Sequence, residues 1–289
     1  METYKKIKEI KKRIQFEKNK RRTIGFVPTM GYLHDGHISL IRASKKRSDV
    51  TVVSIFVNPT QFGPSEDFSQ YPRDINRDKT ILEREKVDLL FSPSVEEMYF
   101  EDYKTYVEVT EYQDKLCGKS RKGHFRGVAT IVLKLFHIIT PDIAFFGQKD
   151  AQQALVIKKM VKDLNLDIKI EVLPIVREKD GLALSSRNTY LNEEERVSAV
   201  VLYNSLLKAK ELIKKGVRNC SEVISEMEKI ILSSPHTRID YIEIVNDKLE
   251  PLEEINHNFL IALAVYIGKT RLIDNMMVKK KGRFFKFII

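Results

Sequence analysis

A series of short apolar runs, separated by segments with helical character, constrains the fold most strongly. The runs are TIGFV (23–27), VTVVSIFV (50–57), VDLLF (87–91), DIAFF (142–146) and DIKIEVLPIV (167–176). Continuous apolar runs of this length are typical of strands that are buried on both faces of a parallel sheet. The segments with helical character are 37–47, 73–86, 126–139 and 150–163. Such alternation of strand and helix predicts an open, doubly wound parallel sheet.

The pattern changes after about residue 176. Asn192 is a good helix N-cap and is followed by three glutamates, which favours a helix running to about Gly216. A second helix is expected over 221–233, and then come the strand-like runs 240–246, 259–267 and 271–278. Helices followed by strands predict a smaller α+β domain. We therefore expect two domains, 1–176 and 177–289.

Charge and hydropathy exclude several classes of protein. The formal net charge of the 289 residues is +10, but lysine and arginine alternate with glutamate, as in ILEREKVDLL. That pattern favours an ion-paired surface over a nucleic-acid-binding face. No apolar run has the length of a membrane span, and the lysine-rich start lacks a signal-peptide core. A cytoplasmic protein that binds neither membrane nor nucleic acid is expected, and the basic, aromatic end KKKGRFFKFII has no assigned role.

Two cysteines, Cys117 and Cys220, lie far apart in the chain. They show neither a zinc-ligand spacing nor a disulfide framework, so no resident metal site is predicted from them. GKS (118–120) and GKT (268–270) lack the upstream glycine of a P-loop, and no G-x-G-x-x-G follows the first strand. A dinucleotide-dependent oxidoreductase is therefore disfavoured.

Polar, glycine-rich sequence follows four of the predicted strands. The segments are PTMGYLHDGH (28–37), NPTQF (58–62), GQKD (147–150) and REKDGLALSSRN (177–188). Ligands of open α/β sheets bind beyond the carboxyl ends of the strands, so these segments are the candidate site. Their convergence is a stronger signal than any one of them.

The segment PTMGYLHDGH has the composition of a phosphate site. Gly31 and Gly36 allow close backbone approach, and His34 and His37 share one face of a helix that begins near Asp35. A helix N-terminus offers unpaired N–H groups to an anion. The imidazoles can donate to phosphate oxygens and, when protonated, offset charge on a leaving pyrophosphate.

The other strand ends add groups of the same kind. Lys149 can contact phosphate, and Asp150 can hold a ribose hydroxyl or cap the next helix. LALSSRN supplies hydroxyls and a guanidinium for oxyanions. Gln61 and Gln153 can each donate and accept, which suits a substrate that carries both hydroxyl and carboxylate groups.

With these motifs in place, the chain closely resembles the pantoate–β-alanine ligases of the H-x-G-H nucleotidyltransferase superfamily. The matching stretches are PTMGYLHDGHISLI, FVNPTQF, DFSQYPRD, GHFRGVATIV, PDIAFFGQKDAQQ, VREKDGLALSSRNTYL and TRLIDN. The resemblance implies a Rossmann-like domain with a smaller C-terminal domain that closes over the active site. It also implies ATP-dependent condensation of pantoate with β-alanine through a pantoyl adenylate, releasing AMP and pyrophosphate, with Mg²⁺ on the nucleotide and a homodimer.

The resemblance also implies roles for single residues. His37, His34, Lys149 and Arg187 would be catalytic, with His37 the principal acid-like group. Gln61 and Gln153 would hold pantoate, Gln61 would lie near β-alanine as well, and Asn58 would border the pantoate pocket. The ATP-binding residues would be Met30, Gly31, Tyr32, Leu33, His34, Asp35, Gly36, His37, Gly147, Gln148, Lys149, Asp150, Val176, Leu184, Ser185, Ser186 and Arg187.

Two other functions are weighed against this one. A different H-x-G-H enzyme, such as a nicotinate or phosphopantetheine nucleotidyltransferase, would transfer AMP to a phosphate and stop, and would need neither glutamine. A basic nucleic-acid-binding protein with this fold would need clustered basic and aromatic residues on one face. Only the last residues of the chain have that composition.

Overall fold

The computed structural model describes residues 1–64, 66–282 and 284–289. The chain divides into two compact units, each described here by itself. Unit 1 comprises residues 1–114, 118–147 and 152–173, and unit 2 comprises 115–117, 148–151 and 174–289.

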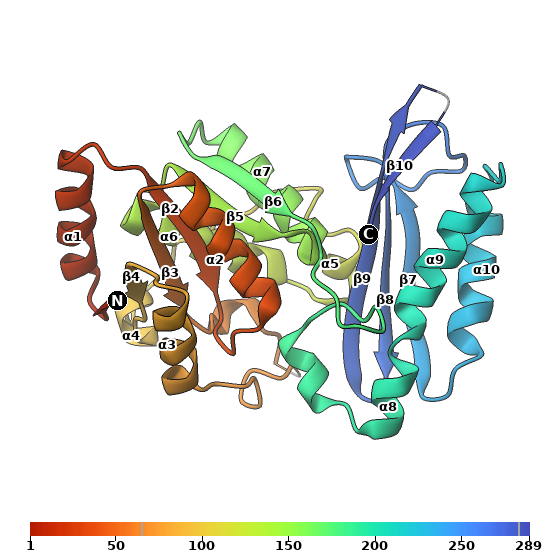
Figure 1. Ribbon diagram of the computed structural model, residues 1–289, viewed down its shortest axis with the longest axis horizontal. Coiled ribbons are helices and arrows are strands. Elements are labelled where there is room, and N and C mark those ends of the chain that lie inside the picture. The colour runs from red at the N-terminus through yellow and green to blue at the C-terminus, as the bar shows by residue number, and fades with distance from the viewer. Residues whose placement is uncertain (65, 283) are drawn as a thin grey trace. The chain divides into compact units, whose positions relative to one another are not determined.

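Unit 1 is built on a parallel sheet with the strand order β1-β4-β3-β2-β5-β6 (Figure 1). Its strands are β1 (Glu2–Tyr4), β2 (Ile24–Thr29), β3 (Val50–Ile55), β4 (Leu89–Phe91), β5 (Ile143–Gly147) and β6 (Lys169–Leu173). The chain moves from β2 toward β3 and β4 on one side, and later from β5 to β6 on the other. The predicted doubly wound parallel sheet is thereby confirmed, and the edge strand β1 is an addition that the pattern of apolar runs did not predict.

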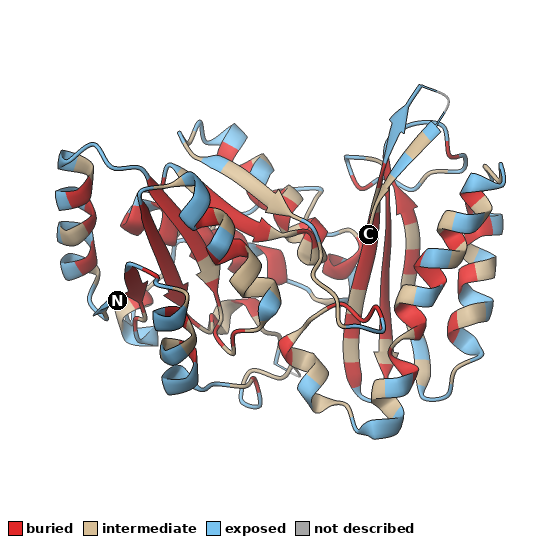
Figure 2. Ribbon diagram, viewed as in Figure 1, coloured by how far each residue is buried: buried red, intermediate tan, exposed pale blue. Residues whose placement is uncertain are grey.

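Helices connect these strands and cover the sheet. They are α1 (Ile7–Asn19), α2 (Asp35–Arg47), the 3₁₀ turn η1 (Pro59–Gln61), α3 (Ile75–Arg84), α4 (Val95–Met98), α5 (Cys117–Ser120), α6 (His124–Ile139) and α7 (Ala151–Asp163). Helix α2 packs on β2, β3 and β5, whereas α6 packs on β2, η1 and α1. The central strands β2 to β5 are mostly buried and carry the core, whereas the edge strands β1 and β6 are half-exposed; Figure 2 shows the central strands as buried ribbon.

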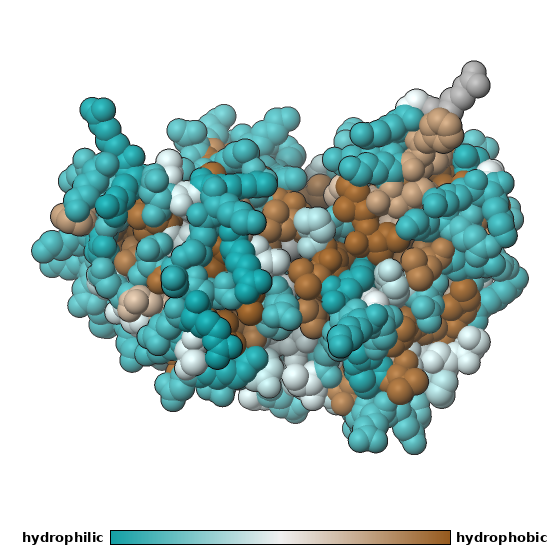
Figure 3. All heavy atoms as spheres, viewed as in Figure 1, coloured by the Kyte–Doolittle hydropathy of each residue, from teal (hydrophilic) through white to brown (hydrophobic). Residues whose placement is uncertain are grey.

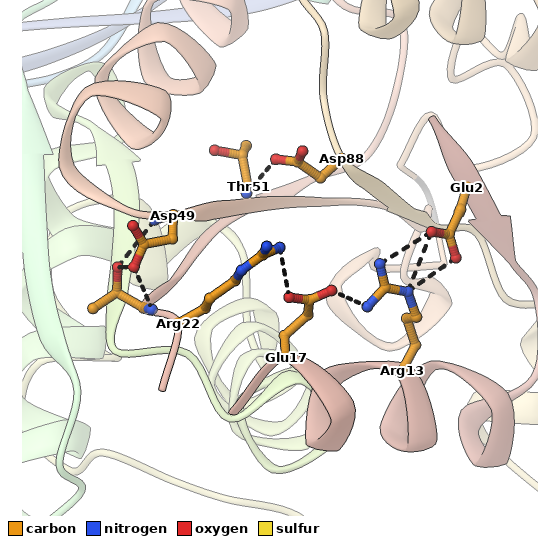
Figure 4. Close-up of polar contacts among 8 residues, drawn as sticks. Glu2, Arg13, Glu17, Arg22, Asp49, Thr51 and Asp88 are labelled. Carbon is orange, nitrogen blue, oxygen red and sulfur yellow. Dashed lines mark hydrogen bonds and ion pairs between the residues drawn. The ribbon is translucent and has the colours of Figure 1, made fainter. Parts of the chain in front are cut away.

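Three aspartates hold the amino edge of this sheet. Asp49, Asp88 and Asp142 each stand directly before a strand, namely β3, β4 and β5. Each carboxylate accepts a hydrogen bond from a backbone N–H of the neighbouring strand or of the residue leading into it. The pairs are Thr23 to Asp49 (2.9 Å), Thr51 to Asp88 (2.8 Å) and Ile24 to Asp142 (2.6 Å), and Figure 4 shows the pair of Thr51 and Asp88.

A buried glutamate completes this edge. Glu17, in the last turn of α1, accepts hydrogen bonds from Arg13 and from Arg22, the latter at 2.9 Å, and Arg13 also binds Glu2 of β1 (Figure 4). Burial alone would raise the pKa of Glu17, but the two arginines outweigh burial and hold that pKa below its usual value. The network ties α1, β1 and the approach to β2 together.

Gly25 lets α2 approach β2 closely. A Cβ at this position would lie 2.3 Å from the Oγ atoms of both Ser44 and Ser48. Neither hydroxyl can turn away without loss, because Ser44 Oγ bonds Thr51 Oγ1 (2.9 Å) and Ser48 Oγ donates to the Ser44 carbonyl (2.8 Å).

We expect Gly25→Ala to lower the free energy of unfolding by about 1–3 kcal/mol, the usual effect of overpacking a core. Urea denaturation measures the change. Gly63→Ala is the matched control, because the nearest atom to its added Cβ lies 3.7 Å away. Equal denaturation midpoints for the two variants would show that the contact between α2 and β2 is not tight.

Unit 2 contains an antiparallel sheet with the order β10-β9-β8-β7. Its strands are β7 (Thr237–Val245), β8 (Phe259–Ile267), β9 (Thr270–Lys281) and β10 (Phe284–Ile288), and its helices and turns are η2 (Gln148–Asp150), η3 (Ser186–Tyr190), α8 (Glu193–Ser198), α9 (Val201–Lys214) and α10 (Cys220–Leu232). Helix α10 packs on β7, and α9 packs on β8, β9 and α10. The shared core contains Leu206, Met227, Leu263 and Met276.

Two features of unit 2 differ from the sequence-based expectation. The single helix expected from Asn192 to Gly216 is broken at residues 199–200, where the Val200 N–H bonds the Val197 carbonyl (3.4 Å), one residue nearer than in an α-helix. The apolar face continues through the break with buried Ala199 and Leu202, so its periodicity gives no sign of it. The C-terminal segment, which had no assigned structure, forms strand β10.

Charged side chains cover much of the surface. On the face shown in Figure 3, hydrophilic residues surround small apolar patches. Ion pairs such as Arg42–Glu85 (2.7 Å) and Lys215–Glu211 (2.5 Å) agree with the interleaved charges of the sequence. Within the described residues, no helix is both long enough and apolar enough to cross a membrane.

Candidate active site

The sheet of unit 1 has its switch point between β2 and β5. These strands are hydrogen-bonded neighbours, yet β2 leads through α2 to β3 and β5 leads through α7 to β6. Open α/β sheets bind their ligands outside the carboxyl ends of the strands at such a point. The segment 30–37 follows β2, and Gly147 is the last residue of β5. Two of the four candidate segments therefore begin where the topology places a ligand.

The loop after β2 is held by α3. Gly31 and Tyr32 have φ of +84° and +52°, so the chain turns sharply there. Asp78, with 1% of its surface exposed, accepts hydrogen bonds from the N–H groups of Tyr32 (2.7 Å) and Leu33 (2.8 Å). Burial raises the pKa of Asp78, although these two amides oppose the shift. The neighbouring Arg77 donates to the Leu33 carbonyl (2.9 Å), and its guanidinium lies over the Tyr32 ring.

His34 and His37 form a reciprocal cap at the start of α2. His34 Nδ1 accepts from the Gly36 N–H (3.2 Å), and His37 Nδ1 accepts from the His34 N–H (3.3 Å). The ring centroids are 4.1 Å apart. Since Nδ1 accepts in both rings, a neutral ring carries its proton on Nε2. The fold thus selects the tautomer in which Nε2 is the donor atom.

The amide of Gln61 lies beside this loop. Gln61 is in η1, which follows β3, and its Nε2 donates to Met30 Sδ (3.1 Å). Asn58 Nδ2 donates to Gln61 Oε1 (3.1 Å) and to the Gly127 carbonyl (3.1 Å). The structure therefore brings the predicted substrate residue Gln61 next to Met30, the first residue of the predicted ATP-binding segment, and Asn58 next to Gln61.

The buried side chain of Asn58 is itself fixed in place. Its Oδ1 accepts from the hydroxyls of Tyr99 (2.9 Å) and Thr60 (3.0 Å). Burial raises the pKa of Tyr99 to about 12, so its hydroxyl remains a donor at neutral pH. Both polar atoms of Asn58 thus bind protein groups, an arrangement that suits a residue that orients Gln61.

Helix α6 fixes the backbone of η1. A Cβ on Gly127 would lie 2.4 Å from the Thr60 carbonyl oxygen and 2.7 Å from the Gln61 nitrogen, so only glycine allows this approach. His124 Nδ1 donates to the Gln61 carbonyl (2.8 Å), and Arg121 Nη1 lies 3.0 Å from the other ring nitrogen. The position of Gln61 therefore depends on a glycine and a histidine of one helix.

In unit 2, β9 holds the turn η2 that carries Lys149. Asn275 Nδ2 donates to the carbonyls of Gln148 (2.9 Å) and Lys149 (3.0 Å). The Lys149 ammonium lies 3.5 Å from the Asp150 carboxylate, and both side chains are partly exposed. They can therefore reach a ligand while the backbone behind them is held.

The neighbouring residue of β9 holds the other predicted ATP-binding segment of unit 2. Buried Asp274 pairs with Arg177 (2.6 and 2.9 Å), and burial raises the pKa of Asp274 in spite of that arginine. The Leu184 N–H donates to the Val176 carbonyl (3.0 Å). Ser185 caps η3, with its Oγ accepting from the Arg187 N–H (3.3 Å).

The predicted site residues are thus divided between the two units. Unit 1 contains the segment 30–37, Asn58, Gln61, Gly147 and Gln153, and unit 2 contains 148–150, Val176 and 184–187. Gln153 is half-buried in the first turn of α7, next to buried Gln152, which donates to the Tyr112 carbonyl (2.8 Å).

Sequence reasoning did not identify the residues that hold these segments. Asp78 stands one helical turn before the buried Leu82 in α3, and a carboxylate on a buried helix face is a signal for a bound partner. Asp274 and Asn275 belong to TRLIDN, and His124 and Gly127 to GHFRG. Both stretches carry the family resemblance, but spacing alone gives them no role.

Fold and site together define a class. A doubly wound sheet whose switch point carries two histidines, spaced H-x-G-H, at a helix N-terminus is typical of enzymes that transfer nucleotidyl groups.

Comparison with known proteins narrows the class to one family. Residues 2–277 match the family model described as pantoate-beta-alanine ligase. The pantothenate synthetase of Caldicellulosiruptor saccharolyticus is 60% identical over 275 residues, covering 95% of this chain and 98% of the relative. The crystal structure of pantothenate synthetase from Thermus thermophilus has a TM-score of 0.91 at 43% identity, covering 95% and 98% of the two chains. The pantoate–β-alanine ligase from Francisella tularensis, solved in complex with beta-gamma ATP and β-alanine, has a TM-score of 0.79 at 38% identity, covering 96% and 97%. The chain belongs to the pantoate–β-alanine ligase family.

We expect Asp78→Asn to loosen the loop after β2. An amide offers one acceptor where the carboxylate offers two, so one of the Tyr32 and Leu33 N–H groups would face an NH₂ group. Hydrogen exchange of these amides should become faster by roughly tenfold or more, as expected when a buried hydrogen bond to a charged group is lost. Asp74→Asn is the matched control, because asparagine caps the start of α3 as well as aspartate does. Unchanged loop exchange in Asp78→Asn would contradict the role of this carboxylate.

Proposed function

We propose that this member of the family uses ATP to activate pantoate as a pantoyl adenylate and then joins it to β-alanine. The observation that carries the proposal is the contact of the Gln61 amide with Met30, at the head of the loop that leads to His34 and His37. Through this contact, an amide that can recognise hydroxyl and carboxylate groups lies against the first residue of the loop that precedes α2. The family match and the Francisella tularensis complex with beta-gamma ATP and β-alanine support the choice of substrates.

The reaction has two steps. The pantoate carboxylate attacks the α-phosphorus of ATP, forming the acyl–phosphate bond of the adenylate and releasing pyrophosphate. The β-alanine amine then attacks the acyl carbon, forms the amide bond and releases AMP together with a proton. Negative charge accumulates on the phosphorus centre and on the departing pyrophosphate, so positioned donors accelerate the first step.

The donors in unit 1 are His34 and His37. Their Nδ1 atoms are occupied by the cap, and their Nε2–H groups donate to triphosphate oxygens. His37 is the principal acid-like group toward the leaving pyrophosphate. The loop from Met30 to Leu33 and the first N–H groups of α2, at Asp35 and Gly36, bind the nucleotide as an anion.

The proposal also assigns nucleotide contacts to residues of unit 2. Lys149 contacts phosphate as a point charge, and Asp150 accepts from the ribose. Gln148 of unit 2, and Gly147 at the end of β5 in unit 1, are assigned to the nucleotide through their backbone. Val176 flanks the adenine, and the segment 184–187 binds the triphosphate, with Arg187 as a planar donor and the Ser185 and Ser186 hydroxyls beside it.

Pantoate recognition falls to Gln61 and Gln153, and Gln61 also lies near β-alanine. Asn58 acts on Gln61, since its own amide binds Tyr99, Thr60 and Gly127. That Asn58 borders the pantoate pocket stays a prediction, and its contact with Gln61 adds a role in orienting that glutamine.

Mg²⁺ enters with the nucleotide in this proposal. No cluster of three His, Cys, Asp or Glu side chains able to hold a metal occurs among residues 1–64, 66–282 and 284–289. That composition suits an ion carried on phosphate oxygens, where Mg²⁺ keeps several of its waters. When bound, the ion would offset charge on the phosphates, and the residues named above would bind and orient the nucleotide.

Three further assignments extend the proposal. The first is that the chain works in the cytoplasm, where ATP is supplied. The second is that it forms a homodimer, because the exposed Phe100 and Tyr106 in unit 1 are apolar surface of the kind that a second copy can cover. That residues 177–289 form a domain that closes over the site stays a prediction.

ATP–pyrophosphate exchange tests the function. We expect exchange that requires pantoate but not β-alanine, and AMP release only after β-alanine is added. A nucleotidyltransferase that passes AMP to a phosphate would show no dependence on pantoate. Exchange without pantoate, or no exchange with all components present, would reject the proposal.

His37→Ala tests the assigned donor. We expect the pantoate-dependent exchange rate to fall by about 10²–10³-fold, equivalent to about 3 kcal/mol, as for a removed oxyanion donor. His37→Gln separates chemistry from capping, because glutamine at this position can still accept from the His34 N–H. The pantoate-dependent ATP–pyrophosphate exchange rate should be low in both His37 variants. It should be unchanged in the control His257→Ala, because His257 is exposed. Full activity in His37→Gln would limit His37 to a capping role.

A further inference from the structure

The C-terminal strand β10 has no counterpart in the family match. The match ends at residue 277, and residues 278–289 lie beyond it. These residues complete β9 and form β10, which pairs with β9 in the antiparallel register Ile288 to Met277 and Phe284 to Lys281. Residues 284–288 of the basic, aromatic segment that the sequence left without a role therefore form an edge strand of unit 2.

Alternate side chains dock β10 onto the core of unit 2. Phe285, Phe287 and Ile289 pack against this core, and the Phe285 ring lies edge-on to Phe259 with centroids 5.8 Å apart. Arg218 stacks over Phe285 at 5.1 Å. By contrast, Phe284 is 79% exposed. One face of β10, with Phe285 and Phe287, therefore packs on the core and sets the position of the strand, whereas Phe284 lies on its exposed face.

The end of β10 binds the turn η2. Gln148, only 4% exposed, donates through Nε2 to the Ile288 carbonyl (3.0 Å) and to Asn275 Oδ1 (3.3 Å). Asn275, 3% exposed, returns two hydrogen bonds to the carbonyls of Gln148 and Lys149. One face of η2 is therefore held by a closed network of two buried amides and a carbonyl of the C-terminal strand.

We propose that β10 positions the nucleotide-binding turn η2, with the Ile288 carbonyl fixing Gln148 and thereby the Lys149 and Asp150 that follow it. The proposal rests on the ATP-binding role of Lys149 and Asp150 given above. A buried amide donor that loses its acceptor is strongly destabilised, so loss of Ile288 would favour rotation of Gln148 and weaken the return bonds from Asn275. In this chain, β10 is thus a positioning element supplied from beyond the matched length of the family.

Truncation of the last two residues tests the proposal, because the chain then ends at Phe287 and the Ile288 carbonyl is removed. We expect hydrogen exchange of the Lys149 and Asp150 amides to become roughly three- to tenfold faster, the range for one lost hydrogen bond. The apparent KM for ATP should rise by a similar factor. The KM values for pantoate and β-alanine should not change, and neither should the urea midpoint of unit 1.

Two matched variants control for lost packing. Removal of Ile289 alone takes away one docked side chain but keeps the Ile288 oxygen as an acceptor. Phe284→Ser alters the same strand on its exposed face. Both should retain the wild-type exchange of η2 and the wild-type KM for ATP. If either one behaves like the two-residue truncation, general loosening of the strand explains the effect and the proposal is wrong.

Gln148→Leu provides a second route that leaves the strand intact. It should raise the exchange of the Lys149 and Asp150 amides, and combining it with the two-residue truncation should add nothing further. Additive effects would overturn the proposal, because they would mean that β10 acts other than through Gln148. Hydrogen exchange of the η2 amides is measured without substrates. It therefore tests whether β10 holds η2 even if the wild-type chain shows no pantoate-dependent ATP–pyrophosphate exchange.

Discussion

The parallel sheet of unit 1 depends on the aspartates that precede its strands. Asp49, Asp88 and Asp142 accept backbone N–H groups of the adjacent strand, so each crossover fixes the level at which the next strand begins. Parallel strands have no tight turn to set their register, and this carboxylate edge supplies it. Strands β2 and β5 are neighbours in the sheet, so the switch point lies where two of the candidate ligand-binding segments begin.

Buried polar side chains then hold the segments that leave this edge. Asp78 binds two amides of the loop after β2, and Asn275 binds two carbonyls of η2. In both places a buried side chain satisfies backbone groups that would otherwise lack partners, which leaves the outward groups of the loop for a ligand. The orientation of the loop after β2 and of η2 is therefore set by buried residues that stand behind them.

The contrast between the candidate site segments and the buried residues that hold them explains which features the sequence predicts and which it does not. Strands β2 to β6 of the parallel sheet, the helix starting near Asp35 and the segments at the strand ends follow from local periodicity and polarity, whereas β1 does not. Asp78, Asn275 and Ile288 act on segments distant in the chain, and no local pattern links them to their targets. Strand β10 was missed for the same reason, because its apolar alternation is short and has meaning only against β9.

The histidine pair depends both on the local sequence pattern and on the contacts that the fold makes. Its residue types and spacing are visible in the sequence, but its chemistry depends on the cap that the fold makes from it. A cap that uses Nδ1 of both rings requires Nδ1 to be unprotonated, so it opposes the doubly protonated imidazolium that the sequence alone allows. It leaves a neutral donor at Nε2, which can stabilise a departing pyrophosphate by hydrogen bonding. The cap therefore links the tautomer of each ring to the start of the helix that carries them.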